Sequence, residues 1–532
     1  MYYATLVSVK ILACFLFSIV NASFPPVDLG YAVHVPTTVN STSSGLSYAN
    51  YDNIRFAHPP LGPLRFRKPK TPPPKQDGIQ NGSAPLFSRD CVAAVPVQFS
   101  VPGLEGAAWG NEDCLFLNVR VPEGIKEGEK VPVFHWLYGG AYVLGSKDPV
   151  FGDHLGLYND LQLPGQKFIS VVSNYRLGLY GWASSASEDM DANVGLHDAV
   201  AALEWTQQYI SKFGGDPEQV TVAGASAGAG LATLMLFGNG GEGKLPFQKA
   251  FISSPGLSPR RNSTIRDAIY DGVLNATNCD SLDCLRNASE ETLFEANKYL
   301  VINTTSPVGK GSSPGFFPVV DGDYIPDLIP VLAREGRFNK GVEQVISSNM
   351  VNEWQTLSSN EFKMPSEFPN LVRQIIPNAD DATVERIKSL YECSDNEPQQ
   401  LAREFRSDTE FNCNAYNIAE AYKYRAKHYF MSIPPATHGQ DGFYYFYNNN
   451  SNSNPSTPMK NAQLARELEE YFRRLITRSN NTRDFAELPD WPVYGDGKRS
   501  FDLALEGIKV SRNRWERCET LNELIGDAKN GA

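Results

Sequence analysis

The residues from Val220 to Gly230 restrict the fold of this chain more than any other stretch. A run of β-branched residues, Val220-Thr221-Val222, leads into the pentad Gly224-Ala225-Ser226-Ala227-Gly228, and small residues compatible with a helix follow. A strand, a sharp turn and a helix in this order form a nucleophile elbow, which holds a serine exposed on a strained backbone. We therefore predict that Ser226 is a nucleophile at the carboxyl edge of a sheet, where open α/β folds place their ligands.

Continuous apolar runs predict the other strands of that sheet. They cover residues 131–138, 168–175 and 250–254, and residues 193–213 between them have apolar side chains at helical spacing. Buried strands that alternate with helices are typical of a mostly parallel sheet. We expect an α/β fold with a large, mostly parallel central sheet flanked by helices. Residues 262–300 are expected to form a helical insertion, and residues 464–476 an amphipathic helix.

The first residues have the pattern of a secretory signal peptide. Lys10 precedes an apolar run from Ile11 to Val20, and small residues follow at positions where a signal peptidase would cut. The run is too short to span a bilayer, so no stable membrane insertion is expected. We predict a signal peptide over residues 1–22, a secreted protein, and a single domain with helical insertions over residues 23–532.

Charge and composition exclude several classes of partner. The net charge of −12 argues against binding to nucleic acid or to anionic membranes. The seven histidines form no cluster with metal-ligand spacing, so neither a metal nor an organic cofactor is expected.

The oligomeric state stays open. Candidate N-glycosylation sites, in keeping with secretion, are Asn40, Asn81, Asn262, Asn275, Asn287, Asn303, Asn449 and Asn480.

Several further motifs occur in a fixed order along the chain. They are Glu112-Asp113-Cys114-Leu115, Tyr138-Gly139-Gly140-Ala141, Asn174-Tyr175-Arg176-Leu177-Gly178, Phe213-Gly214-Gly215-Asp216-Pro217 and the serine pentad. This series resembles the type-B carboxylesterase/lipase family of the α/β-hydrolase fold, to which cholinesterases also belong, over nearly the whole mature chain. The resemblance implies the α/β-hydrolase fold, hydrolysis of carboxylic esters, and the disulfides Cys91–Cys114 and Cys279–Cys284. Cys393, Cys413 and Cys518 remain. The pair Cys393–Cys413 is a guess, and the sequence does not show which of the three thiols stays free.

The order of the catalytic residues in this fold selects the histidine. The sequence must present serine, then an acid, then histidine, and only His428 and His438 follow Ser226. His428 lies in a helical pattern over residues 419–429, which indicates an ordinary surface or packed histidine. His438 lies in an irregular loop before a possible aromatic strand over residues 443–447, and the family has its histidine in a similar His-Gly segment. We predict that His438 is the general base.

The acid is chosen by the resemblance. Glu353 follows a strand-like run over residues 342–347, and the family carries the third triad member in a similar segment. Here Trp354 replaces the glycine that usually follows the glutamate. Asp321 is the rival, although it more readily builds a turn. The oxyanion hole would use the N–H of Ala227 and, by resemblance, those of Gly140 and Ala141.

The likeness leaves the substrate open. The loop between Cys91 and Cys114 has too few residues and too many Pro and Gly residues for a long lid helix, which favours an esterase on soluble or modestly hydrophobic esters. Aromatic hydroxycinnamate esters are one class that a secreted member could hydrolyse, although composition does not show it. A lipase or sterol esterase on lipid-like esters is the first alternative, and a catalytically inactive adhesion relative the second. Ala225, where much of the family has glutamate, and the position of Trp109 argue against a cholinesterase.

Overall fold

The structure is a computed structural model. It describes residues 24–96, 104–148, 154–159, 165–258, 263–302, 315–355, 367–391, 398–448, 459–477, 488–512 and 515–532 of the 532-residue chain. The expected signal peptide lies outside these residues. So do the candidate glycosylation sites Asn262, Asn303, Asn449 and Asn480.

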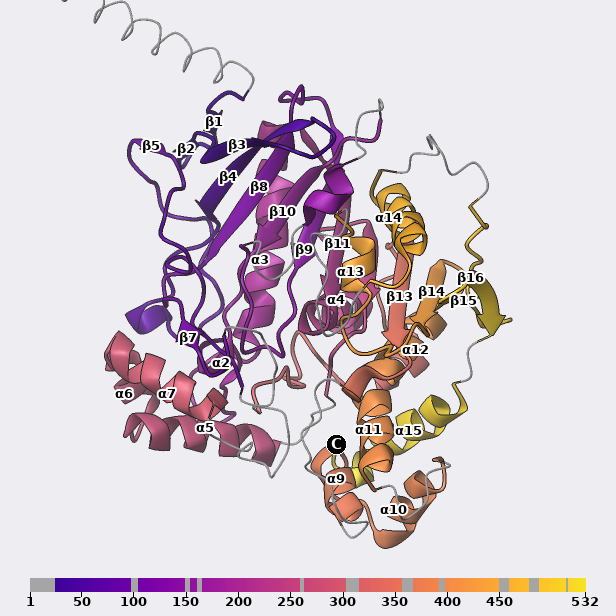
Figure 1. The fold of residues 1–532 in the computed structure, drawn as a ribbon. Coiled ribbons are helices and arrows are strands. Elements are labelled where there is room, and N and C mark those ends of the chain that lie inside the picture. Colours follow the sequence, from indigo (N-terminus) through magenta and orange to yellow (C-terminus); the bar gives the residue numbers. More distant parts are fainter. Residues whose placement is uncertain are drawn as a thin grey trace, which may run out of the picture.

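A large mixed sheet runs through the molecule (Figure 1), with the strand order β16-β15-β14-β13-β12-β11-β9-β10-β8-β4-β3. Every neighbouring pair from β15 to β10 is parallel, and the pairs at both edges are antiparallel. The sheet therefore has a parallel centre, which confirms the predicted α/β-hydrolase fold. The strands are β3 (Thr38–Ser41), β4 (Ser47–Arg55), β8 (Phe116–Pro122), β9 (Val131–Leu137), β10 (Ile169–Ser173), β11 (Gly215–Ala225), β12 (Lys249–Ser253), β13 (Gln344–Met350), β14 (Ala426–Met431), β15 (Arg499–Ala504) and β16 (Gly507–Arg512).

Two smaller sheets lie towards the N-terminal side of the molecule. One is formed by the short strands β1 (Val27–Asp28), β2 (Val33–His34) and β5 (Ile79–Gln80), and the other by β6 (Ala93–Ala94) and β7 (Ala108–Trp109). The second pair lies inside the loop between Cys91 and Cys114, and the described residues of that loop form no helix.

Helices cover the sheet and extend beyond it. α3 (Val194–Tyr209) contacts β10 and β11, and α4 (Ala227–Phe237) contacts β9, β11 and β12. In Figure 1, α5, α6 and α7 form one cluster near β7, while α9, α10, α11 and α15 lie together below the C-terminal part of the sheet. The remaining helices are α2 (Gly178–Trp182), α5 (Ser263–Thr277), α6 (Leu282–Asn287), α7 (Glu290–Ile302), α8 (Ile329–Arg334), α9 (Phe368–Ile375), α10 (Asp381–Lys388), α11 (Pro398–Ser407), α12 (Cys413–Ala421), α13 (Gly442–Tyr445), α14 (Ala462–Thr477) and α15 (Glu516–Gly526).

Aromatic rings fill the space between the middle of the sheet and α14. The ring of Phe472 on α14 lies 5.5 Å from that of Phe134 and 4.2 Å from that of Phe251. Phe446, just after α13, packs 4.9 Å from Trp136 on β9. Each buried aromatic side chain contributes a large apolar area. This cluster fixes α13, and the loop before it, over the centre of the sheet.

Two predictions about the chain around residue 430 are wrong. Residues 419–429 are not one helix, because α12 ends at Ala421 and residues 426–431 form strand β14. Residues 443–447 are not a strand but lie on and after the short helix α13. His428 is therefore a fully buried strand residue that bonds to Ser500 Oγ at 2.9 Å. Tertiary packing has overridden the local pattern in both places.

Both disulfides that the resemblance implies are formed, Cys91–Cys114 and Cys279–Cys284. The guessed pair Cys393–Cys413 is wrong, because Cys413 on α12 is bonded to Cys518 on α15.

Among the glycosylation candidates, Asn40, Asn81, Asn275 and Asn287 are exposed, as glycan attachment requires. In the described part of the chain, no helix combines the length and the apolar character needed to cross a bilayer.

A buried histidine lies in the middle of β9 and gives the stability of the fold a pH dependence. His135 is completely buried, and its two ring nitrogens bond to Thr206 Oγ1 at 3.0 Å and Ser173 Oγ at 2.9 Å. Burial lowers the pKa of His135 to about 3. The folded state therefore keeps the ring neutral at pH values where the unfolded chain protonates it.

We expect the variant His135→Gln to lose this pH dependence. Below the unfolded pKa of about 6.5, protonation stabilises only the unfolded chain, so the wild type loses about 1.4 kcal/mol per pH unit from this group as the pH falls towards the folded pKa. Between pH 7.5 and pH 4.5 the difference in free energy of unfolding between wild type and variant should change by roughly 3 kcal/mol. Urea unfolding at several pH values measures it, and parallel pH profiles for the two proteins would contradict the expectation.

Candidate active site

Ser226 lies on the turn between β11 and α4, where the sequence predicts an elbow. Its backbone has φ 56° and ψ −124°, a conformation that costs a non-glycine residue about 1–3 kcal/mol. Hydrogen bonds hold it there: its N–H donates to Ser253 O at 2.9 Å, and its carbonyl accepts from Gly230 N and Gly256 N at 2.9 Å. The side chain is half-buried and thus reachable.

The residues around Ser226 must be small, because backbone and side-chain atoms of neighbouring residues lie close to them. A methyl group on Gly228 would lie 2.0 Å from Leu137 O, and one on Gly224 would lie 2.5 Å from the carbonyl carbon of Gly228. A methyl group on Gly139 would lie 2.8 Å from Ser226 Cβ, so the loop after β9 passes directly beside the serine. The two glycines of the pentad thus allow the turn to close, and Gly139 allows the neighbouring loop to approach it.

Glu353 and His438 meet at the carboxyl ends of β13 and β14. Glu353 begins a short 3-10 turn after β13 and is completely buried. Its Oε2 accepts a hydrogen bond from His438 Nδ1 at 2.6 Å, and its Oε1 accepts one from Met350 N at 2.7 Å. The Asn352 side chain donates to Pro435 O at 2.8 Å and so binds the two loops together. Trp354 does not disturb this geometry.

The second ring nitrogen of His438 is buried beside the Phe411 ring. His438 Nε2 is buried and has no hydrogen-bond partner among the described residues, Ser226 Oγ included. The Phe411 ring packs on the imidazole with 4.3 Å between ring centroids. A methyl group on Gly256 would touch both the Phe411 ring and Ser226 C at 3.2 Å. Hydrogen bonds of this kind are often long without substrate and shorten in the reacting complex.

Three backbone N–H groups are the candidates for an oxyanion hole. Ala227 is the first residue of α4, and Gly140 and Ala141 follow β9 with φ values of 126° and 50°. A methyl group on Gly140 would lie 2.1 Å from Leu144 O, which explains the glycine. No hydrogen bond between described residues uses the N–H of Gly140, Ala141 or Ala227. These donors are thus available for a developing negative charge.

Asp441 is a buried carboxyl group at the site that the sequence analysis missed. It lies on the helical turn after His438 and accepts hydrogen bonds from Ser253 Oγ at 2.7 Å and Tyr429 OH at 2.6 Å. Burial raises its pKa, and the nearby Glu353 raises it further, whereas His438 lowers it. Ser253 also accepts the N–H of Ser226, so Asp441 connects the serine turn to the histidine loop. The signal available in the sequence was an acid in the His-Gly-Gln-Asp segment.

The rival acid and the other histidine lie elsewhere. Asp321 Oδ1 accepts the N–H groups of Asp323 and Ile325 at 2.9 and 2.8 Å, and Asp321 Oδ2 accepts Asn193 Nδ2 at 2.8 Å. It therefore builds a turn. Burial lowers the pKa of His428 to about 3, so this ring stays neutral between Ser500 and the aromatic rings around it. Within the described residues, no group of three or more His, Cys, Asp or Glu side chains could hold a metal ion.

Comparison with known proteins finds both esterases and lipases among the relatives of this chain. The model of the carboxylesterase family matches residues 36–517. The chain is 30% identical to carboxylesterase patB of Aspergillus clavatus, over 94% of this chain and 96% of that protein. It is 32% identical to lipase 1 of Geotrichum candidum, over 68% of this chain and 71% of that one. The crystal structure of EstA from Aspergillus niger superposes with a TM-score of 0.80 at 24% identity, covering 96% of this chain and 100% of that one.

Proposed function

Because this chain belongs to the carboxylesterase family, it is a carboxylic-ester hydrolase, and we propose that it works as a serine esterase with Ser226, His438 and Glu353 as its triad. The observations that carry the proposal are the 2.6 Å hydrogen bond from His438 to the buried Glu353 and the strained turn that holds Ser226. Nucleophile, base and orienting acid are the parts that such catalysis needs.

Each residue then has one role in the reaction. Glu353 accepts a hydrogen bond from the Nδ1–H of His438, which keeps the proton on Nδ1 and leaves a lone pair on Nε2. The carboxylate also stabilises the imidazolium that forms. His438 takes the proton of Ser226 as Oγ attacks the ester carbonyl carbon. It next gives this proton to the departing alcohol, which leaves an acyl group on Ser226. A water molecule, deprotonated by His438, then releases the acid and restores the serine.

The oxyanion of each tetrahedral intermediate is stabilised by the N–H groups of Gly140, Ala141 and Ala227. One such donor contributes roughly 2.7–4 kcal/mol of barrier lowering in a comparable hydrolase. Ala141 has an N–H like any residue other than proline, so it serves as a donor as well as glycine would. Its methyl group narrows the space beside the hole.

Secretion is part of the proposal. The charged and apolar pattern of residues 1–22 supports it, and so do the three disulfides, which form and persist in oxidising compartments. The exposed sequons at Asn40, Asn81, Asn275 and Asn287 are then attachment sites for glycans.

We propose soluble or modestly hydrophobic esters as the substrate class. The described part of the loop between Cys91 and Cys114 holds two short strands and no helix, which supports a site without a long amphipathic lid. The similarity to Geotrichum candidum lipase 1 makes long-chain esters the second candidate. A catalytically inactive role is disfavoured because Ser226, Glu353 and His438 are all present.

A series of p-nitrophenyl esters tests the proposal. We expect the purified protein to hydrolyse the acetate and butyrate esters, and to lose this activity when diisopropyl fluorophosphate binds Ser226, which mass spectrometry of the labelled peptide detects. We expect kcat/KM to fall from butyrate to palmitate, with no rise in rate above the solubility limit of the ester. A rise there would favour the lipase alternative. A folded protein without label and without hydrolysis would overturn the esterase function.

A further inference from the structure

Residues 139–148, which we call the oxyanion loop, have a strained backbone. Gly140 and Gly145 both have φ 126°, and between them Ala141 and Tyr142 have φ 50° and 64°. Left-handed conformations in non-glycine residues are unfavourable by about 1–2 kcal/mol each and persist only where the surroundings impose them. The proposed oxyanion donors therefore depend on contacts that hold this loop from outside.

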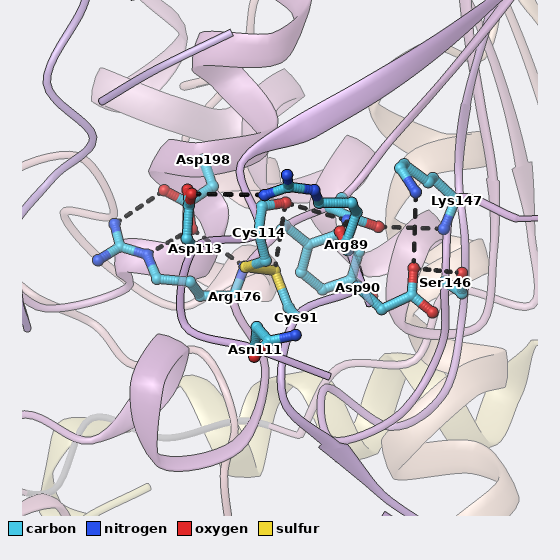
Figure 2. The surroundings of a disulfide bond; sticks show 12 residues. Arg89, Asp90, Cys91, Asn111, Asp113, Cys114, Ser146, Lys147, Arg176 and Asp198 are labelled. Atoms are coloured by element: carbon cyan, nitrogen blue, oxygen red, sulfur yellow. Dashed lines mark hydrogen bonds and ion pairs between the residues drawn. A yellow bond between two sulfur atoms is a disulfide. The ribbon is translucent and has the colours of Figure 1, made fainter. Parts of the chain in front are cut away.

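The far end of the oxyanion loop is held by buried charges (Figure 2). Asp90 is completely buried, and its Oδ1 accepts a hydrogen bond from Ser146 Oγ at 2.8 Å. Lys147 Nζ, on a side chain only 1% exposed, lies 3.7 Å from the same oxygen and 3.2 Å from Asp148 Oδ1. Two consecutive residues of the loop therefore contact one carboxylate, which belongs to the residue just before Cys91.

Hydrogen bonds to backbone groups also join the residues around Cys91 to the oxyanion loop, some of them through the Asn174 side chain. Lys147 N donates to Asn174 Oδ1 at 3.1 Å, and Asn174 Nδ2 in turn donates to Arg89 O at 2.8 Å and Cys114 O at 3.0 Å. Nearer the active site, Ala94 N donates to Val143 O at 3.0 Å. The strand after Cys91 and the oxyanion loop thus lie side by side, and Asp90 is their charged contact.

Holding a loop by a buried ion pair costs the desolvation free energy of both charges. Burial raises the pKa of Asp90, and Lys147 opposes this effect, as does the hydrogen bond from Ser146 Oγ. Such pairs often contribute no more stability than apolar residues of the same size, but removing one partner leaves an unpaired buried charge. Their best-supported benefit is a unique geometry, which is what a set of oxyanion donors requires.

We propose that Asp90 is a positioning residue for ester hydrolysis, which through Ser146 and Lys147 holds the oxyanion loop in the conformation that directs its N–H groups at the oxyanion. This inference rests on the proposed serine-esterase function. Asp90 touches neither Ser226 nor His438, so it acts only through the loop. Its loss displaces donors without removing them.

The variants Asp90→Asn and Lys147→Met test the proposal in the full-length protein. Loss of one donor lowers kcat by about 10²–10³-fold in a comparable enzyme, so we expect displaced donors to lower it by roughly 10–100-fold with KM within about twofold. The affinity for a trifluoromethyl ketone, whose adduct with Ser226 carries an oxyanion, should fall in parallel with kcat/KM. The double variant should lose no more than the worse single one, because both residues act through one contact.

Glu112→Gln is the matched control. Glu112 lies two residues from Cys114 and pairs with Arg65 at 2.7 Å, equally buried beside the same disulfide, but Arg65 donates its remaining bonds to carbonyls of residues 285, 286 and 288. We expect this control to lower the melting temperature and leave kcat and ketone affinity within about twofold. If Asp90→Asn and Lys147→Met behave like the control, the positioning role is wrong.

Two further measurements keep the outcome clear. Rates are expressed per Ser226 site titrated with diisopropyl fluorophosphate, so partial unfolding does not imitate a fall in kcat. If Asp90→Asn does not fold, Ser146→Ala decides, because it removes one hydrogen bond to the same carboxylate without exposing a buried charge; about fivefold lower kcat is expected, and an unchanged kcat overturns the proposal. Failure of the esterase function itself would be seen in the wild type, which would then be neither labelled nor active.

Discussion

Replacing Ser226 with alanine is expected to lower kcat for p-nitrophenyl butyrate by on the order of 10⁵–10⁶-fold, since the nucleophile and base act as a unit. The variant should bind the ester with nearly unchanged affinity, because the substitution removes one hydroxyl group and leaves the surrounding residues in place. It should also take up no diisopropyl fluorophosphate. Rates measured at high enzyme concentration, with a catalytically dead preparation as blank, check the loss. An active Ser226→Ala protein would contradict the mechanism.

The two histidines that follow Ser226 provide a matched pair for the same test. His438→Gln should be as inactive as Ser226→Ala, and the double variant should be no worse than either single one. His428→Gln changes a buried ring on β14 that contacts Ser500 and not the triad. It should unfold more easily but keep kcat within about threefold at 25 °C. The reverse result would place the base at residue 428.

Glu353→Gln is expected to lower kcat by about 10⁴-fold, the loss seen when the triad acid of a serine protease becomes an amide. In the wild type, Glu353 accepts from both His438 Nδ1 and Met350 N. The glutamine can keep the bond from Met350 through its oxygen, but its amino group then faces Nδ1. The imidazole would carry its proton on Nε2, where it could no longer accept the proton of Ser226.

Asp321→Asn is the control for the acid, since Asp321 is the other carboxylate that the sequence allows. Its oxygens accept N–H groups of its own turn and of Asn193, so the variant should lose stability and keep kcat within about twofold. Steady-state kinetics and thermal unfolding of both variants, measured side by side, separate the two roles. A 10³-fold or greater loss in Asp321→Asn, with Glu353→Gln active, would reverse the assignment.

The sequence predicts the parts of this molecule whose chemistry is local. Glycines and alanines around Ser226 are needed by the turn itself, so the elbow can be read from five residues. The central strands β9, β10 and β12 are rich in apolar residues because they are largely buried. Both features depend on residues that are neighbours in the chain.

What the sequence does not reveal depends on distant partners. The residues of β14 include Lys, His and Tyr in a pattern that suits a helix. They form a strand because β14 pairs with β13 on one side and with β15 on the other. Asp441 becomes part of the site because Ser253 and Tyr429, from two other strands, direct hydroxyl groups at it. Cys413 and Cys518 are 105 residues apart, and no spacing rule connects them.

The positive φ at Ser226 also affects which substitutions evolution would favour at this position. Glycine adopts such a conformation freely, so a Ser226→Gly replacement would relieve about 1–3 kcal/mol of strain while abolishing the nucleophile. A lineage released from the need for catalysis would gain heat tolerance by losing its serine. Selection for stability and selection for catalysis thus act in opposite directions on residue 226. Only continued selection for catalysis retains the serine there.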